Sequence, residues 1–136
     1  MIFAKRVFLL AGIYGILVLA PLYFLESRLN EDFPPPITHP EHFYGFVGVA
    51  LTWQLVFLVI SRDPVRYRAL MLPAILEKLS FGIAVWALFL AGRVSTPTLG
   101  GGTIDLLLAG LFGIALARTA RQSAAGDDSA RQAPAS

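Results

Sequence analysis

Three side chains that can bind a metal ion or carry a proton stand together in the stretch ITHPEHFYGF, Ile37 to Phe46. His39 and His42 are three residues apart, a spacing that places both on one face of a helix. Neutral imidazoles so placed can ligate one metal ion, with Glu41 or another carboxylate completing the shell. The other carboxylates considered are Glu31, Asp32 and Asp105. We predict no metal, and name His39 and His42 as the ligands to test.

The same stretch also has the pattern of a helix start. Thr38 and Glu41 form a T-x-x-E capping box, in which each side chain satisfies a backbone N–H of the first turn. Pro40 suits that first turn as well. Helix capping thus accounts for these three residues but for neither histidine. Two further interpretations of the histidines stay open: a protonation or ligand-binding site, and packing of amphipathic rings at a membrane interface.

Ionisable residues also interrupt apolar segments further along the chain. Glu77 and Lys78 lie about two helical turns inside the apolar run 72–91. Such groups cost about 2.5–3.5 kcal/mol at the centre of a membrane. We expect Lys78 to extend towards the nearer surface, and Glu77 to face the interior of a bundle. There it is either a structural ion-pair partner or a proton-coupled or substrate-binding carboxylate. Asp105 is expected at a helix start, where negative charge is favourable, within reach of the histidines.

Several kinds of chemistry are excluded or lack a motif. The chain has no cysteine, which removes disulfides, thiol catalysis and Cys-ligated metal centres. We find no Ser-His-Asp set, Walker loop or dinucleotide fingerprint, and GGGT follows no expected strand. The net charge is +2, with basic residues at the ends of apolar runs, so no nucleic-acid partner is expected. No catalytic residue and no cofactor can be assigned.

The elements that position these residues are membrane spans. Of the 136 residues, 56% are hydrophobic and 15% charged, against about 25% charged in soluble domains. Apolar runs cover about 7–25, 43–60, 72–91 and 103–117, and a span needs roughly 20 residues. We predict an all-α four-transmembrane-helix bundle over 1–117, with a short interfacial helix before the third span. The first run is interpreted as a retained helix rather than a cleaved signal peptide.

Charge and loop composition predict how the bundle is oriented. With both termini inside, only Arg28 and Arg93 of the eleven Lys and Arg residues lie outside. We therefore predict an N-in, C-in protein of the bacterial inner membrane. The loop from Glu26 to Pro40 contains FPPPITHP and is expected to be a semi-rigid strap or a simple spacer. TPTLGGGT is expected to be a flexible outer turn, and 118–136 a disordered cytoplasmic tail.

Small and polar residues inside the runs suggest how the helices pack. Gly45, Gly48 and Thr52 form one stripe of small residues, and the fourth run carries another, made of Gly110, Gly113 and Ala117. Such stripes let membrane helices approach closely, within one chain or between copies. A flat lipophilic ligand is the alternative occupant. Gln54 is expected to hydrogen-bond across helices, because an unpaired amide in hydrocarbon is costly.

The four-run layout from Val7 to Ala117 resembles the small bacterial membrane proteins grouped as DoxX-like, and more distantly the EXPERA-type sterol-isomerase bundles. The stretch RDPVRYRALMLPAILEKLSFG, Arg62 to Gly82, also looks like one in uncharacterised bacterial membrane proteins. The DoxX-like resemblance implies a quinone-linked or accessory membrane subunit. The EXPERA-type resemblance implies acidic residues in a deep cavity, for which Glu77 is the candidate.

We expect a small integral membrane protein that acts as a non-catalytic binding or accessory subunit with an extracytoplasmic contact surface. Its expected partners are membrane lipids, a second copy, or another subunit of a membrane complex. One alternative is an intramembrane enzyme on a lipophilic substrate, with Glu77 or His42 as acid or base. Another is a dimeric proton-coupled transporter using Glu77. The residues expected to carry ligand or partner binding are His39, Glu41, His42, Glu77 and Asp105.

Overall fold

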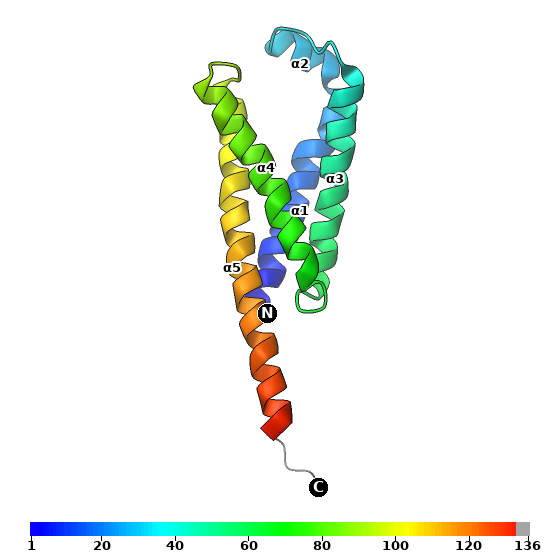
Figure 1. Cartoon of the computed structure of the whole chain (residues 1–136). Coiled ribbons are helices and arrows are strands. Elements are labelled where there is room, and N and C mark those ends of the chain that lie inside the picture. Colours follow the sequence, from blue (N-terminus) through cyan, green and yellow to red (C-terminus); the bar gives the residue numbers. More distant parts are fainter. Residues whose placement is uncertain (133–136) are drawn as a thin grey trace.

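The fold consists of helices throughout the part of the chain that the computed structural model describes, which is residues 1–132 for the backbone and 1–125 for side chains. Four helices are long and apolar enough to cross a membrane. They are α1 (Ile2–Leu19), α3 (Pro40–Arg62), α4 (Met71–Leu90) and α5 (Thr96–Gln132) (Figure 1). This confirms the predicted all-α bundle with four candidate spans.

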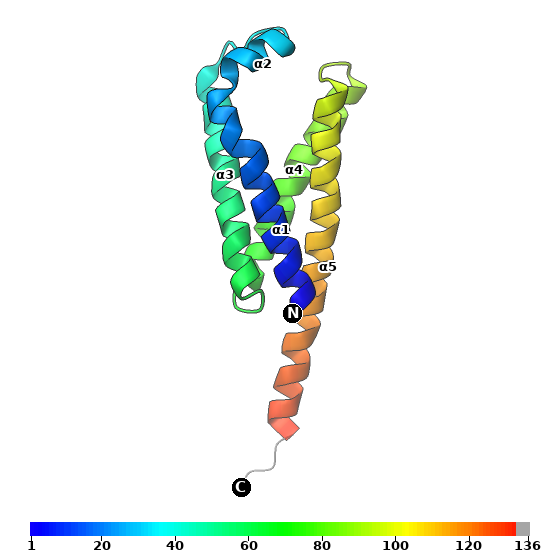
Figure 2. The same cartoon turned by 180° about the vertical axis from the view of Figure 1, so that it is seen from behind.

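The long helices are arranged as two pairs. Helix α1 packs along α3, and α4 packs along α5. The pairs meet at the end that carries the N-terminus and separate towards the end that carries α2 (Glu26–Asp32) (Figures 1 and 2). Three buried phenylalanines join the pairs at the N-terminal end: the ring of Phe112 stacks on Phe8, with centroids 4.2 Å apart, and meets Phe57 edge-on at 5.0 Å. This aromatic core leaves the opposite end more open.

Close contact within each pair depends on glycines that differ from the predicted stripes. A Cβ added to Gly15 would overlap the Gln54 side chain, and one on Gly102 would lie 2.7 Å from Val85 Cβ. In contrast, a Cβ on Gly45, Gly110 or Gly113 would meet no atom within 4 Å. Those three positions therefore make no close contact inside the described chain, and packing between copies there stays a prediction.

The connection between α1 and α3 is more helical than the sequence suggested. A 3₁₀ segment, Ala20–Phe24, leads into α2, and only residues 33–39 form the irregular strap. The Tyr44 hydroxyl of α3 donates to Glu26 Oε2 at 2.6 Å, and its ring stacks on Tyr23 with centroids 6.0 Å apart. These contacts hold the start of α2 against α3.

The last helix begins earlier and continues further than predicted. TPTLGGGT was expected to be a turn, but α5 starts at Thr96, with Pro97 in a first turn that tolerates it. Close packing of Gly102 against Val85 favours the helical conformation at that glycine. The same helix runs on through 118–132, where no regular structure was expected. That segment is rich in Ala, Arg and Gln, which extend an existing helix readily. Residues 133–136 of the predicted tail lie outside the described residues.

Candidate functional site

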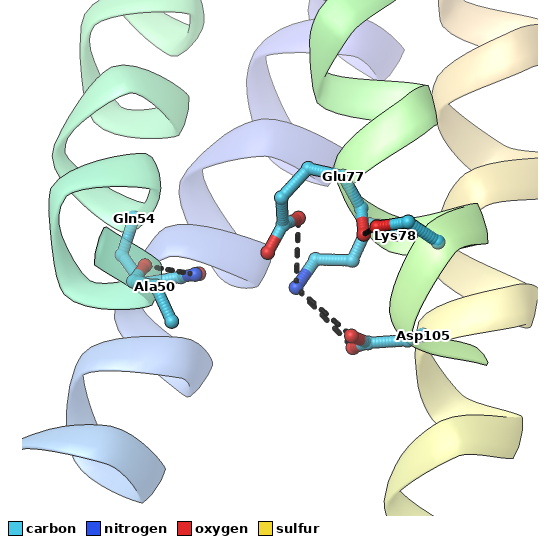
Figure 3. Close-up of polar contacts among 6 residues, drawn as sticks. Ala50, Gln54, Glu77, Lys78 and Asp105 are labelled. Atoms are coloured by element: carbon cyan, nitrogen blue, oxygen red, sulfur yellow. Dashed lines mark hydrogen bonds and ion pairs between the residues drawn. The ribbon is translucent and has the colours of Figure 1, made fainter. Parts of the chain in front are cut away.

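A buried ion cluster lies between α4 and α5 (Figure 3). Lys78 Nζ is 3.2 Å from Asp105 Oδ1 and 3.3 Å from Glu77 Oε2. The side chains of Lys78, Glu77 and Asp105 are only 7%, 17% and 13% exposed. Two carboxylates around one ammonium leave one net negative charge when all three are ionised.

Two predictions about this cluster were wrong. Lys78 does not extend to the surface, because Asp105 on the facing helix offers a counter-ion inside the bundle. Asp105 does not lie at a helix start, because α5 begins at Thr96 and places residue 105 well inside the helix. The expectation that Glu77 faces the interior and takes part in an ion pair agrees with its position beside Lys78.

Gln54 places an unpaired acceptor opposite this cluster (Figure 3). The residue is 1% exposed, and its Nε2 donates to the backbone oxygen of Ala50 at 2.8 Å. The expected bond to another helix is therefore not made. Because a carbonyl oxygen can only accept a hydrogen bond, the amide atom that faces Ala50 O is the donor Nε2, and Oε1 is the free atom. Gln54 Oε1 has no hydrogen-bond partner, although it lies in the contact between α3 and Gly15 of α1.

Glu77 contributes a second unsatisfied acceptor. Its Oε2 is close enough to Lys78 for an ion pair, at 3.3 Å, yet the direction of approach does not form a hydrogen bond. Among side chains of residues 1–125, Gln54 Oε1 and Glu77 Oε2 are the two buried polar atoms without such a partner. Both are oxygens, so the site is short of donors rather than acceptors.

These polar groups line a cavity of about 200 Å³ between the two helix pairs. Gln54 comes from α3, Glu77 and Lys78 from α4, and Asp105 from α5. Helix α1 supplies Tyr14, Gly15 and aliphatic side chains, so all four long helices contribute to the wall. The rest of the lining is mainly apolar. The cavity therefore combines a few charged side chains with an otherwise apolar lining that suits a lipophilic molecule.

A larger groove of about 780 Å³ runs between α3 and α4 and adjoins the cavity. Its lining includes Glu41 and His42 near the start of α3, and Glu77 deeper in the bundle. Phe46, Phe81 and Glu77 line both hollows. The rings of Phe46 and Phe81 stack with centroids 5.7 Å apart, joining α3 to α4. This aromatic pair therefore lies where the groove meets the cavity.

The structure also brings His39, Glu41 and His42 together at the start of α3. One ligand atom from each residue lies within 4.8 Å of the others, and all three residues are exposed. His39 Nδ1 is 3.1 Å from Glu41 Oε1. The predicted capping box is absent: His39, not Thr38, precedes the helix, and no side chain caps it. Asp105 is engaged by Lys78 and does not join this group.

The sequence pointed to Glu77 and Asp105 but missed their common partner and the role of Gln54. The available signal was that three apolar runs each carry a polar residue: Gln54, Lys78 and Asp105. Intramembrane polar residues usually face one another, so their convergence could have been proposed. Comparison of the chain with known protein families, characterised proteins and solved structures finds no match. Function must therefore be argued from this site.

Proposed function

We propose that this protein binds, within the membrane, a lipophilic molecule that carries a cationic, hydrogen-bond-donating head group. The observation that supports the proposal most directly is the pair of buried oxygens without donors, Gln54 Oε1 and Glu77 Oε2, on two residues that line one cavity. A buried acceptor without a partner costs about 1–3 kcal/mol. A ligand that donates to both atoms would recover that free energy, which gives the site its specificity.

The charge of the cluster favours a cation over a neutral donor. Lys78 faces two carboxylates, so a second positive charge would balance the ionised site. Aromatic rings of Tyr14, Phe46 and Phe81 line the same cavity, and aromatic faces attract cations by about 0.5–2 kcal/mol. An anionic head group would meet repulsion from Glu77 and Asp105. Ammonium and amidinium amphiphiles therefore fit best.

The volumes of the cavity and the groove suit different parts of the ligand. A cavity of about 200 Å³ is smaller than typical drug-sized sites of roughly 300–1,000 Å³. It can accommodate a head group but not a long apolar body. The adjoining groove, about 780 Å³, is lined by Val49, Trp53 and Leu76. We assign the head group to the cavity and the apolar chain to the groove, on either side of the Phe46–Phe81 pair.

The proposal includes a membrane orientation. We place both termini in the cytoplasm of a bacterial cell and α2 on the outer side of its inner membrane, because only Arg28 and Arg93 of the Lys and Arg residues then lie outside, while Lys78 is buried in the bundle. The segment before α4, with the 3₁₀ turn Arg68–Leu70, would then lie at the inner interface. The lipid bilayer would supply the ligand laterally. Binding needs no chemical step, in keeping with a non-catalytic binding or accessory subunit.

The experiment compares dodecylammonium with dodecanol as probes for the purified full-length chain in detergent. Trp53 lines the groove, so its fluorescence reports binding in a Trp86→Phe background. We expect saturable binding of the amine and at least about tenfold weaker binding of the alcohol, a difference of roughly 1.4 kcal/mol. Gln54→Leu should weaken amine binding. That substitution removes an unsatisfied buried oxygen, so the fold should persist.

Thr52→Val is the matched control, because Thr52 lies on the same helix, is exposed, and donates only to the Gly48 carbonyl of that helix. It should leave amine binding unchanged. Equal affinities for amine and alcohol would contradict a cation site. Equal amine affinities in Gln54→Leu and the parent chain would contradict the assignment of the head group to this cavity.

Acid–base catalysis on a lipophilic substrate is the second candidate function. One observation favours it: the groove is lined by both Glu77 and His42, the two residues named as possible acid or base. A lipophilic substrate in the groove could then contact either group. Loss of turnover in Glu77→Gln at saturating substrate, with turnover retained in Gln54→Leu, would support catalysis, whereas a chain that only binds would show no turnover to lose. The proton-coupled transporter remains a prediction from the sequence.

A further inference from the structure

We infer that His39, Glu41 and His42 form a site for one divalent transition-metal ion at the start of α3. This inference does not rest on the amine head-group site, because none of the three residues lines the cavity that contains Gln54. Each of the three side chains contributes a ligand atom, and those atoms already lie within 4.8 Å of one another.

The geometry needs little adjustment to hold an ion. In a tetrahedral zinc site, with Zn–N distances of about 2.0–2.1 Å, neighbouring ligand atoms are about 3.3 Å apart. His39 Nδ1 and Glu41 Oε1 are already 3.1 Å apart, and the two imidazole rings are tilted with centroids at 5.3 Å. The side chains of His39 and Glu41 are 68% and 65% exposed, so small rotations would meet no packed neighbours.

Neither helix capping nor packing against the rest of the chain accounts for His39, Glu41 and His42. Glu41 directs its carboxylate to His39 instead of capping the helix, and His39 precedes α3 without capping it through its side chain. All three residues are exposed, so no other part of the described chain packs over them. What remains is a cluster of two imidazoles and one carboxylate in four consecutive residues, for which ion binding is a sufficient physical reason.

The ligand types indicate the class of metal. Imidazole nitrogen favours Zn²⁺ and its first-row neighbours, whereas Ca²⁺ and Mg²⁺ prefer shells made of oxygen. Three protein ligands leave a fourth position for water or another molecule, as in open zinc sites. Glu41 and His42 also line the groove between α3 and α4. The ion would therefore lie at the mouth of that groove.

The test uses tag-free, full-length protein treated with chelator, titrated with Co²⁺ and followed by visible absorption, with Zn²⁺ as competitor. We expect saturation at one equivalent. His39→Ala and His42→Ala should each weaken binding by at least about tenfold, because even loss of a residue that only supports a ligand commonly costs that much. The exposed substitutions should leave thermal unfolding unchanged.

Two control variants separate this site from other carboxylates. Asp32→Asn alters an exposed acidic residue that pairs with Arg28, and it should not change Co²⁺ affinity. Glu77→Gln should also leave affinity unchanged, because Glu77 lies deeper in the groove and is not one of the three residues whose ligand atoms come together. Absence of saturable binding, or equal affinity in the His39→Ala/His42→Ala double variant, would overturn the inference. A loss in Glu77→Gln instead would place the metal in the cavity and also overturn it.

Discussion

Lys78 Nζ and Asp105 Oδ1 are 3.2 Å apart, and this contact joins α4 to α5 in the interior of the bundle. The residues are 27 positions apart in the chain and meet because the two helices form an antiparallel pair. Glu77, the second carboxylate beside this ammonium, lies next to Lys78 on α4. One ammonium thus stabilises two carboxylates that would otherwise be buried without a counter-ion.

Loss of the ammonium should destabilise the bundle strongly. Lys78→Met would leave Glu77 and Asp105 close together without positive charge. Breaking a buried ion pair by removing one partner costs about 3–5 kcal/mol. We expect a clear fall in the thermal unfolding midpoint, followed by circular dichroism in detergent.

The double variant Lys78→Met/Asp105→Asn serves as the control for that experiment, because it removes charges of both signs. It should unfold at a higher temperature than Lys78→Met alone, since well-packed neutral replacements of buried ion pairs are often tolerated. If the single and double variants unfolded at the same temperature, charge compensation would not be what Lys78 provides.

Close packing of α4 on α5 should be sensitive to a single methyl group. A Cβ on Gly102 would lie 2.7 Å from Val85 Cβ, an atom next to the backbone that cannot rotate away. We expect Gly102→Ala to destabilise the pair by about 1–3 kcal/mol, the usual range for overpacking. Gly100→Ala, two residues earlier on the same helix, meets no atom within 4 Å and should be neutral or stabilising. Similar midpoints for both variants would contradict the observed helix contact.

The four spans could be predicted because hydropathy is a local property and the bilayer sets the length of each span. The pairing of Asp105 with Lys78 could not be predicted, because the start of the last helix was expected at the wrong residue. The glycines of TPTLGGGT suggested a turn, so the expected helix began near Thr103 and left Asp105 at its start. In the structure α5 begins at Thr96, so Asp105 lies deep enough to meet Lys78.

The role of Gln54 was hidden for a different reason. Beyond Lys5 and Arg6, helix α1 is mainly apolar on every side, so its sequence does not say which side faces protein and which faces lipid. Its rotation about its own axis decides that Gly15, rather than a larger residue, lies against Gln54. That rotation depends on contacts between glycines and side chains of other helices, which no periodicity in α1 reveals.

Thr38 should contribute little to stability, because the capping box is not formed. A capping threonine replaced by alanine costs about 1 kcal/mol. In this structure His39 precedes α3, and no side chain caps that helix. We expect Thr38→Ala to leave the unfolding midpoint within experimental error of the parent chain. A fall of the size expected for a lost cap would show that Thr38 does cap the helix in solution.

The proposed orientation predicts which end of α4 can be labelled from outside the cell. The chain has no cysteine, so single substitutions give an unambiguous signal. Ala69 and Ala91 are exposed and lie on opposite sides of α4 along the chain. With both termini inside, Ala91→Cys should react with a membrane-impermeant maleimide in intact spheroplasts, and Ala69→Cys only after lysis.

The two alanine substitutions change no charge, so they leave the distribution of Lys and Arg that sets orientation untouched. The parent chain without cysteine gives the background, and labelling after lysis shows that each site can react. Labelling of Ala69→Cys but not Ala91→Cys before lysis would invert the orientation and place the histidine cluster in the cytoplasm. Equal labelling of both would mean that copies insert in both directions, which the charge bias argues against.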